Sequence, residues 1–341
     1  MNSRKLAQKQ RQELKNLNPE VLSRTELVEY IIRFGTLAPS THNTQPWLVE
    51  VKNDEIKVTP DLEKQIIVAD PTNRDLYISV GAFIKNILLT CEALGIKTSL
   101  KLGRDSSTIS LDFPLKVSVL KPDLLDAILK RQNFRGFFEP NPDFRVAKQS
   151  IGEVLDDNQN VKISLYEDKE TIEKLAKLTA EGLEMAYAQK PFRTEIAGFI
   201  NSNLSSKRTG LFGYSLRMNM LISIIIPKVL KKKDLGPKLA KLNYSSFLSS
   251  PGVIVLSAPD NHKSWLSTGL ALEEILVRLT QEDIFSSIYV ASIEIGDLRD
   301  SVAKIVESSE GCLPQLVFCI GKVSDTLPYT VRKDLKEILK D

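Results

Sequence analysis

The sequence predicts an α+β protein in which one structural unit occurs twice. Two segments, at 78–99 and 267–287, each begin with small residues and a glycine and carry Leu or Ile at helical spacing. An extended segment precedes each helix, NDEIKVTPD in the first half and SSPGVIVLSAPD in the second. Strand-like residues follow each helix, LDFPLKVSVL and LPQLVFCIGKV. This repeated order predicts two related halves, at about 22–120 and 121–341, behind an N-terminal arm at 1–21.

The elements of the first half follow from local signals. The arm is polar and lacks the apolar core of a secretory signal, so we expect a polar helix or a frayed end. The segment VEYIIRFGTLA is predicted to be a helix that stops before Pro39. The segment LVEVK is then a strand. In the repeated helices we expect small-residue N-caps immediately before Gly81 and Gly269.

The second half carries a long insertion at about 185–250. Glycine and proline divide it into short helices, at Gly210, Gly213, Gly236 and Pro237. Its most apolar stretch, MNMLISIIIPKVL at 218–230, is too short to span a bilayer, which takes about 20 residues. A basic flank leaves attachment to a membrane surface as an alternative, but we expect a buried or lid helix. Insertions of this size are either mobile or functional.

Composition excludes several classes of function. The 341 residues are 42% hydrophobic and 26% charged, with a net charge of +3, which by itself does not imply a nucleic-acid partner. Two histidines exclude a multi-histidine metal site, and we expect no bound metal. The cysteines Cys91, Cys312 and Cys319 lie in apolar segments without CxxC spacing, which predicts reduced core thiols of a cytoplasmic protein. There is no GxGxxG, GxxxxGK[ST], HExxH or GxSxG motif.

The most informative segment is APSTHNTQPW at 38–47. It places the short polar side chains of Ser40, Thr41, Asn43 and Gln45 on a loop whose backbone amides are also free. Taken alone it could be an ordinary polar helix-to-strand loop with a packed Trp. As a whole it resembles the Pro-Ser-x-x-Asn-x-Gln-Pro-Trp signature of FMN-binding nitroreductases, which begins here at Pro39.

Three later segments are similar to other parts of that family's flavin site. They are Arg131-Gln132-Asn133-Phe134-Arg135, with Asn133 where Ser is usual, then Ile284-Phe285-Ser286-Ser287 and Thr330-Val331-Arg332-Lys333. Segments at 70–76 and 314–316 also resemble the single-chain, Acg-like group of this superfamily. The likeness runs from about 25 to 335 and is tight only in the first motif.

The resemblance implies a flavin site built from both halves. Arg131 or Arg135, with Arg332 and Lys333, would bind the phosphate of FMN. Ser40, Thr41, Asn43 and Asn133 would bind the ribityl chain and ring, and backbone amides near Ser286 and Ser287 would approach N5. Each arginine alone could equally be a surface ion pair. Arg74 has two readings, a structural tie to Asp70 or Asp75 and a flavin-side role.

A second site would form if the two halves exchanged their roles, but the motifs that it needs are absent from the sequence. NPEVLSRTELVEY, in the first half, lacks Arg-x-Ser-x-Arg, and EVLDDNQNVKISL, in the second, lacks the Pro-Ser signature. We therefore expect a fused pseudo-dimer, a monomer that mimics the family's homodimer and holds one FMN per chain. Neither a nucleic acid nor a membrane is expected as a partner.

The resemblance implies three functions. The first is an oxidoreductase that uses NADPH or NADH to reduce a nitroaromatic, quinone or similar small acceptor, with the flavin carrying the chemistry and no catalytic side chain. The second is a non-catalytic FMN-binding or sequestering protein in which the 185–250 insertion closes over the flavin. The third is flavin-consuming or O2-dependent chemistry. We favour the first; the sequence does not name the acceptor or the nicotinamide.

Overall fold

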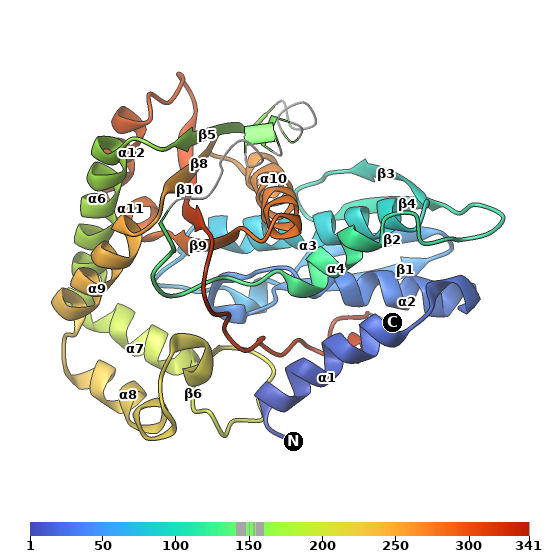
Figure 1. The fold of residues 1–341 in the computed structure, drawn as a ribbon, viewed down its shortest axis with the longest axis horizontal. Coiled ribbons are helices and arrows are strands. Elements are labelled where there is room, and N and C mark those ends of the chain that lie inside the picture. Colours follow the sequence, from blue (N-terminus) through green and yellow to red (C-terminus); the bar gives the residue numbers. More distant parts are fainter. Residues whose placement is uncertain (141–147, 150, 153, 155–159, 341) are drawn as a thin grey trace.

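The computed structural model describes residues 1–140, 148–149, 151–152, 154 and 160–340, and it has the predicted mixture of helices and sheets (Figure 1). The first half holds a four-stranded antiparallel sheet. Its strands are, in spatial order, β1 (Trp47–Lys52), β2 (Glu55–Pro60), β4 (Ser107–Asp112) and β3 (Lys97–Lys101).

The second half repeats this arrangement. Its four-stranded antiparallel sheet has the spatial order β5 (Lys162–Tyr166), β8 (Gly252–Ala258), β10 (Leu313–Gly321) and β9 (Phe285–Tyr289). In both sheets the order is therefore first, second, fourth and third strand. A 20-residue helix joins the second strand to the third, α3 (Arg74–Ala93) in one half and α10 (His262–Gln281) in the other. The predicted two-half α+β fold is confirmed at the level of topology.

The two long helices cross at a pair of glycines. A Cβ on Gly81 would lie 2.1 Å from the carbonyl oxygen of Leu266, and one on Gly269 would lie 2.0 Å from that of Ile78. The contact is reciprocal, because each carbonyl belongs to the residue three positions before the opposing glycine. Only glycine permits so close an approach of two backbones. The halves thus pack about an approximate two-fold relation centred on this crossing.

The predicted N-caps before these glycines are wrong. The N-cap residues are Asn73 for α3 and Asn261 for α10, so Gly81 and Gly269 lie in the second turn or beyond, inside the helices. The error arose because a glycine followed by an apolar periodic stretch looks like a helix start, whereas here both glycines serve a helix crossing.

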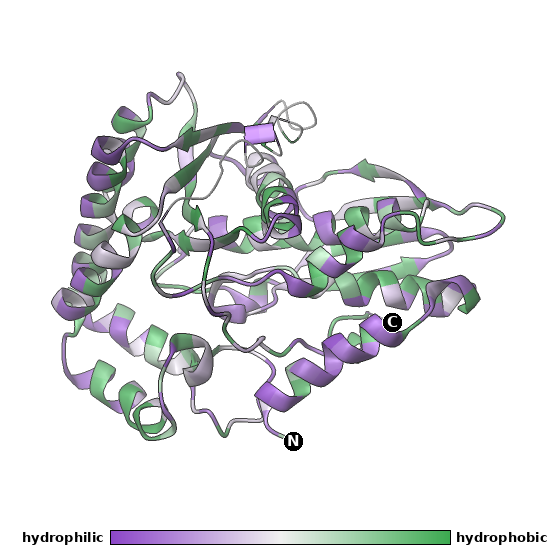
Figure 2. Ribbon diagram, in the orientation of Figure 1, coloured by the Kyte–Doolittle hydropathy of each residue, from purple (hydrophilic) through white to green (hydrophobic). Residues whose placement is uncertain are grey.

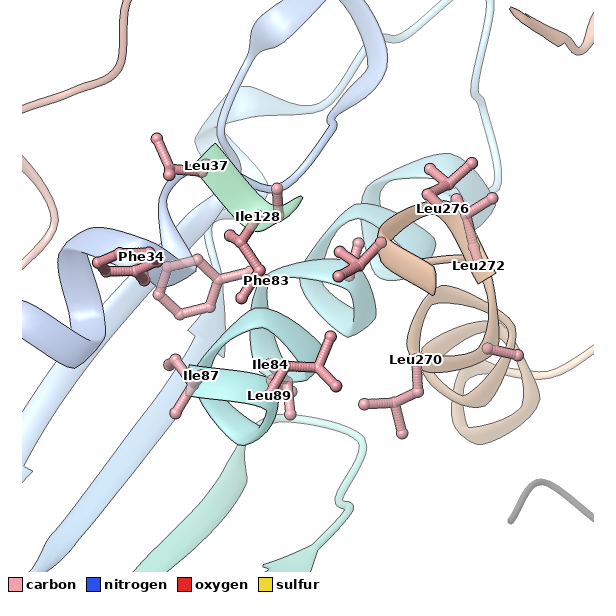
Figure 3. Packing of buried hydrophobic residues seen from close by; sticks show 14 of the residues in the cluster. Phe34, Leu37, Phe83, Ile84, Ile87, Leu89, Ile128, Leu270, Leu272 and Leu276 are labelled. Atoms are coloured by element: carbon pink, nitrogen blue, oxygen red, sulfur yellow. The ribbon is translucent and has the colours of Figure 1, made fainter. Parts of the chain in front are cut away.

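The largest hydrophobic cluster extends through both halves. Figure 3 shows Phe83, Ile84 and Ile87 of α3 beside Phe34 and Leu37, which lie at the end of α2 (Arg24–Gly35), and on the other side Leu272 and Leu276 of α10. The cluster also includes Ile128 of α4 (Pro122–Lys130). Among the described helices, α3 alone is long and apolar enough to cross a membrane, and most of it is buried in this core.

Helix α2 begins where the sequence provides a strong start signal. Ser23 caps it, and the Glu26 carboxylate accepts a hydrogen bond from the Ser23 backbone N–H, which completes a capping box. The helix ends just before the 38–47 loop, as predicted. This firm helix fixes the position from which the signature loop starts.

The chain ends tie the halves together. Helix α1 (Ser3–Asn16) is well formed and buries Ala7 and Leu14, so the N-terminal arm is a packed helix. The segment after β10 returns to the first half, where the backbone of Val49 exchanges hydrogen bonds with Ile338 and Lys340 (Figure 1). This return carries residues 327–333 back between the halves.

The remaining helices belong to the second half. The insertion contributes three of them, α7, α8 and α9, and α9 packs against α6. They are α6 (Lys169–Ala188), α7 (Lys190–Phe199), α8 (Met220–Lys232), α9 (Gly236–Leu248), α11 (Ala291–Glu294) and α12 (Leu298–Ile305), with the short parallel strands β6 (Ile200–Asn201) and β7 (Leu211–Phe212). Short 3-10 helices occur at η1 (Pro19–Val21), η2 (Thr41–Asn43), η3 (Leu62–Lys64), η4 (Gly213–Leu216) and η5 (Leu335–Glu337).

Candidate active site

A cavity of about 360 Å³ lies where the two halves, the insertion and α1 meet. Its walls come from the 39–43 loop and α3 in the first half, and from α10, β9 and the segments 131–135 and 327–332 in the second. The size is that of a small-molecule site. Of the residues predicted from the sequence, the following line it: Pro39, Ser40, Thr41, Asn43, Arg131, Asn133, Arg135 and Arg332.

The signature loop has a strained backbone. His42, Asn43 and Gln45 all adopt left-handed conformations, with φ of 51°, 55° and 52°. Such conformations cost energy for residues other than glycine and concentrate at functional sites. Internal hydrogen bonds stabilise the loop: the Gln45 backbone N–H donates to Ser40 Oγ at 3.0 Å, and its Nε2 donates to the carbonyl of Arg208 at 2.8 Å.

Gln45 and Lys333 support the cavity wall from behind and do not line the cavity. The Lys333 backbone N–H donates to Gln45 Oε1 at 2.7 Å, and its Nζ donates to the Gln45 carbonyl at 2.8 Å. Both residues are buried. The predicted contact of Lys333 with a phosphate is therefore corrected: its ammonium is already used to hold the loop.

Two arginines bring the predicted segments of the two halves together. Arg131 Nη2 and Arg332 Nη2 both donate to the carbonyl of Leu37, just beyond the C-terminus of α2. Arg332 Nη1 also donates to Asn43 Oδ1 at 3.1 Å. The negative end of a helix dipole favours cations at such a place. The loop and the arginines, which lie far apart in the sequence, are thus parts of one cavity wall.

A third arginine, Arg11 of α1, was missed by the sequence analysis. Its Nε donates to the carbonyl of Leu129 at 2.9 Å, and its guanidinium lies 4.1 Å from the centroid of the Tyr329 ring. Its Nη1 is buried without a hydrogen-bond partner among the described residues. The sequence contained one signal for it, because Ala7, Arg11 and Leu14 lie on a single helical face. A charged side chain on an otherwise apolar face is uncommon unless it is paired or has a function.

One buried carboxylate, Glu273, interacts with two of these guanidiniums, Arg131 and Arg332. Arg131 Nε lies 3.0 Å from Glu273 Oε1 on α10, and both side chains are almost wholly buried. Burial raises the pKa of Glu273 to about 7, although Arg131 and Arg332 oppose the effect. Burial lowers the pKa of Arg11 to about 9, opposed by Tyr329 and reinforced by Arg131. Burial, Arg11 and Arg131 lower the pKa of Arg332.

This cluster therefore carries excess positive charge. Guanidiniums stay protonated in proteins, so three of them beside one carboxylate leave a charge of about +2, or +3 when Glu273 is protonated. Buried like charges are costly unless a counter-charge is supplied. The arrangement suits a dianionic group, and it can bind such a group through forked hydrogen bonds.

The opposite wall of the cavity is acidic. Thr41 Oγ1 donates to Asp75 Oδ2 at 3.2 Å, and Asp75 lines the cavity. Burial raises the pKa of Asp70 to about 7, and the neighbouring Asp75 adds to this. Burial and then Asp75 raise the pKa of Glu294 as well. The carboxyl groups of Asp70 and Glu294 behind this wall therefore bind protons more readily than exposed carboxyl groups do.

Of the two roles considered for Arg74, the structure favours the structural one, an ion pair with Asp75. Its Nη2 lies 2.9 Å from Asp75 Oδ1, and its Nη1 donates to the carbonyl of Ile293 at 3.2 Å. It does not line the cavity. Arg74 therefore ties the start of α3 to the second half and partly neutralises the acidic cluster.

His42, which the sequence analysis considered only as a metal ligand, lies in the cavity wall. Its ring centroid is 5.1 Å from that of Phe199 at the end of α7. Burial lowers the pKa of His42 to about 4, although Asp75 opposes the shift, so the ring is neutral at physiological pH. Its Nε2 is buried with no hydrogen-bond partner among the described residues.

Ser286 and Ser287 do not line the cavity. They are buried inside strand β9, where the Ser286 carbonyl accepts a hydrogen bond from Phe134 N at 2.7 Å. The backbone N–H of Ile288, which does line the cavity, already donates to Asn133 Oδ1 at 3.0 Å. The segment expected to approach a flavin N5 through its backbone amides is therefore a strand, and the Ile288 amide in it is already bonded to Asn133.

The insertion forms one side of the cavity. Ile196, Gly210, Leu211, Ser215 and Leu216 line it, and Arg135 Nη1 donates to the Ser215 carbonyl at 3.4 Å. The position expected for a cover is thus occupied by residues 196–216. Helix α8 does not line the cavity, and its apolar residues are largely exposed, so its predicted role as a buried or lid helix is wrong.

Polar contacts hold the insertion to the rest of the chain. Arg208 binds Asp334 through two guanidinium nitrogens, at 2.7 and 2.5 Å. The Glu195 carboxylate accepts hydrogen bonds from the backbone amides of Val68 and Ala69. The segment that could carry a second site, EVLDDNQNVKISL, lies partly outside the described residues.

Comparison with known proteins places the chain among full-length relatives. No family model matches the sequence. The Mycobacterium tuberculosis H37Rv protein named "Putative NAD(P)H nitroreductase acg" is 21% identical over 334 residues, which cover 94% of this chain and 97% of the relative. The chain is thus a homologue, over nearly its whole length, of a protein named as an Acg-type putative nitroreductase. A second protein of that strain, "Putative NAD(P)H nitroreductase Rv3131", is 27% identical over 104 residues, 30% of each chain.

Among solved structures, the FMN and NADPH-dependent nitroreductase NfnB from Sphigopyxis sp. strain HMH is 15% identical. The alignment covers 64% of this Acg-like chain and 97% of NfnB, with a TM-score of 0.44.

Proposed function

We propose that this Acg-like protein is an FMN-dependent oxidoreductase. It would take electrons from NADPH or NADH and pass them to a nitroaromatic, a quinone or a similar small acceptor. The observation that supports this most is the meeting of the 39–43 loop with Arg131 and Arg332 around one cavity between the two halves.

The residues present fit an FMN phosphate. This group is close to a dianion at neutral pH, and the cluster of Arg11, Arg131 and Arg332 with Glu273 has an excess charge of about +2. Two of the buried nitrogens, Arg11 Nη1 and Arg332 Nε, have no partner among the described residues. Unpaired buried donors beside a cavity indicate a missing anionic acceptor.

Other residues suit the rest of the cofactor. Ser40, Thr41 and Asn43 offer short polar groups for hydroxyl and ring oxygens, while Leu272, Ile78 and Leu316 offer apolar contact surface. When bound, FMN supplies the hydride and electron transfer chemistry. The chain itself would position the cofactor, exclude water through the insertion, and hold protons on Asp70 and Glu294 behind Asp75.

Other parts of the proposal follow from the fold. One chain contains both halves of the cavity, so we propose a monomer that acts as a pseudo-dimer and binds one FMN. The three cysteines are free, with Cys91 and Cys319 buried, which is compatible with a reducing, cytoplasmic setting. We also keep the boundaries 1–21, 22–120 and 121–341 as the proposed division of the chain.

One observation favours a second function, storage or sequestration of FMN. Five residues of the insertion between Ile196 and Leu216 line the cavity, and Arg208 and Glu195 fasten this segment to the rest of the chain. If this cover stays closed, a nicotinamide cannot reach a bound flavin. The two functions therefore differ in one property, which is access to the cavity.

Anaerobic titration of the FMN-loaded protein with NADPH, and separately with NADH, tests the proposal. An oxidoreductase should lose its visible flavin absorbance within seconds of mixing with at least one nicotinamide. Protein that keeps its oxidised spectrum with both, but is bleached by dithionite, would contradict the enzyme and favour sequestration.

A variant with a more weakly held insertion distinguishes an enzyme whose cavity opens slowly from a protein that has no reductase activity. Arg208→Gln removes the ion pairs to Asp334 and Glu337 but keeps the Arg208 carbonyl that binds Gln45. If opening of the cover limits the reaction, this variant should be bleached several-fold faster than the wild type. Lys57→Gln, which removes an exposed ion pair with Glu50, is the control.

A further inference from the structure

Helix α8 exposes several large apolar side chains to solvent. Met220, Leu221, Ile222, Ile224 and Ile225 are 49%, 66%, 47%, 46% and 55% exposed. Only Ser223 and Leu230 of this helix are buried. The helix lies at the periphery of the molecule, where Figure 2 shows its first turns as hydrophobic. Five large exposed aliphatic residues within one and a half turns form a patch of the kind that marks an interaction site.

A basic cluster follows this patch on the same helix. Lys228, Lys231, Lys232 and Lys233 are exposed, and none forms an ion pair with a described residue. Residues 218–233 contain no Asp or Glu. The helix therefore has an apolar first half and a cationic second half, both facing outward.

We propose that α8 attaches the protein to the surface of an anionic phospholipid membrane. An exposed aliphatic face with adjacent lysines can enter the boundary between headgroups and acyl chains, while the lysines bind the negative headgroups. This inference replaces the expectation, drawn from the sequence, that no membrane is a partner. It does not depend on the proposed flavin chemistry.

The charge argues against a second copy of the chain as the occupant. Two copies of α8 would bring two clusters of four lysines to the same interface without any acidic residue on either helix. Like charges at an interface are unfavourable, whereas a headgroup layer supplies the opposite charge. Four lysines near an anionic surface can each strengthen binding about fivefold.

Helix α8 also lies close in sequence to the cavity wall. Leu216 lines the cavity, and α8 begins four residues later at Met220. Membrane attachment would therefore hold the insertion at the bilayer surface, next to the wall that it forms.

Co-sedimentation of the full chain with vesicles tests the proposal. Binding should be at least tenfold stronger to phosphatidylcholine vesicles that contain phosphatidylglycerol than to pure phosphatidylcholine vesicles, and should weaken at high salt. Leu221→Ser with Ile225→Ser should reduce binding about tenfold or more, and so should Lys231→Glu with Lys232→Glu.

Matched controls change the same kinds of residue elsewhere. Leu115→Ser removes an exposed leucine from the first half, and Lys97→Glu with Lys101→Glu makes the same charge change on β3. Both controls should bind vesicles like the wild type. Absence of binding, or equal losses in the α8 variants and the controls, would overturn the proposal. So would dimerisation in light scattering that Leu221→Ser with Ile225→Ser abolishes, because the face would then be a self-association surface.

Discussion

Protein in which Arg131 and Arg332 are both replaced by methionine should lose about a thousandfold in affinity for FMN, while its affinity for riboflavin should change less than about fivefold. Each charged hydrogen bond to the phosphate contributes roughly 1.5–3 kcal/mol, and about 1.4 kcal/mol is tenfold in binding. Riboflavin lacks the phosphate and should not depend on this cluster. Flavin fluorescence titration of both ligands measures the two affinities.

Comparison of the affinities for FMN and riboflavin distinguishes loss of phosphate binding from general damage to the fold. Burial already raises the pKa of Glu273 to about 7, so without the arginines this carboxyl can stay protonated and neutral. Arg24→Met, which removes an exposed ion pair with Asp54, should leave both affinities unchanged. Equal losses for FMN and riboflavin would mean that the arginines only support the fold, and unchanged FMN affinity would refute the phosphate assignment.

Arg11→Met provides a smaller, matched change in the same cluster. Its Nη1 has no hydrogen-bond partner in the part of the chain that the structure describes, so its removal should lower FMN affinity about tenfold and again spare riboflavin. Removal of one of three like charges should also relieve repulsion in the protein without cofactor. A variant that binds FMN as tightly as the wild type would exclude α1 from the phosphate subsite.

Gly269→Ala should destabilise the fold by about 3 kcal/mol, at the upper end of the usual cost of overpacking. The added methyl would lie 2.0 Å from the Ile78 carbonyl oxygen and 2.8 Å from the Cα of Gly81, which are backbone atoms that cannot rotate away. The helices must then separate, which also moves the α3 and α10 walls of the cavity. Chemical denaturation of both proteins without flavin measures the effect.

Gly198→Ala, in helix α7, is the control for this change. A Cβ at this position meets no atom within 4 Å, so alanine should be neutral or should stabilise by up to about 1 kcal/mol. If Gly269→Ala is as stable as Gly198→Ala, the crossing of α3 and α10 does not require glycine. The close packing of the two halves would then need another explanation.

Features encoded by local or repeated patterns could be predicted from the sequence. The repeated strand–helix–strand order predicted two related α+β halves, and this is confirmed. The predicted strand at 111–120 is wrong except for its first two residues, which belong to β4. The loop at 38–47 and the arginines at 131 and 332 were expected to meet, and the structure places them in one cavity wall. That expectation depended on the family resemblance, since nothing local joins residues so far apart.

Other features depended on packing between distant elements. Arg11 has no motif around it and becomes part of the cavity only because α1 packs near Leu129 and Tyr329. Lys333 matched a basic motif, but its ammonium is used by the Gln45 carbonyl. Helix α8 was expected inside because its residues are apolar, yet exposure is decided by what packs against a helix, and here little does.

The proposed function requires a single FMN site between the two halves of one chain. The number of FMN molecules bound per chain can be measured by titration of the purified, cofactor-free protein with FMN. Mass spectrometry of the intact complex gives the same number independently. We predict saturation at one FMN per chain, with submicromolar affinity and a flavin spectrum altered by burial. Protein that takes up no FMN, or that binds two per chain, would contradict the account.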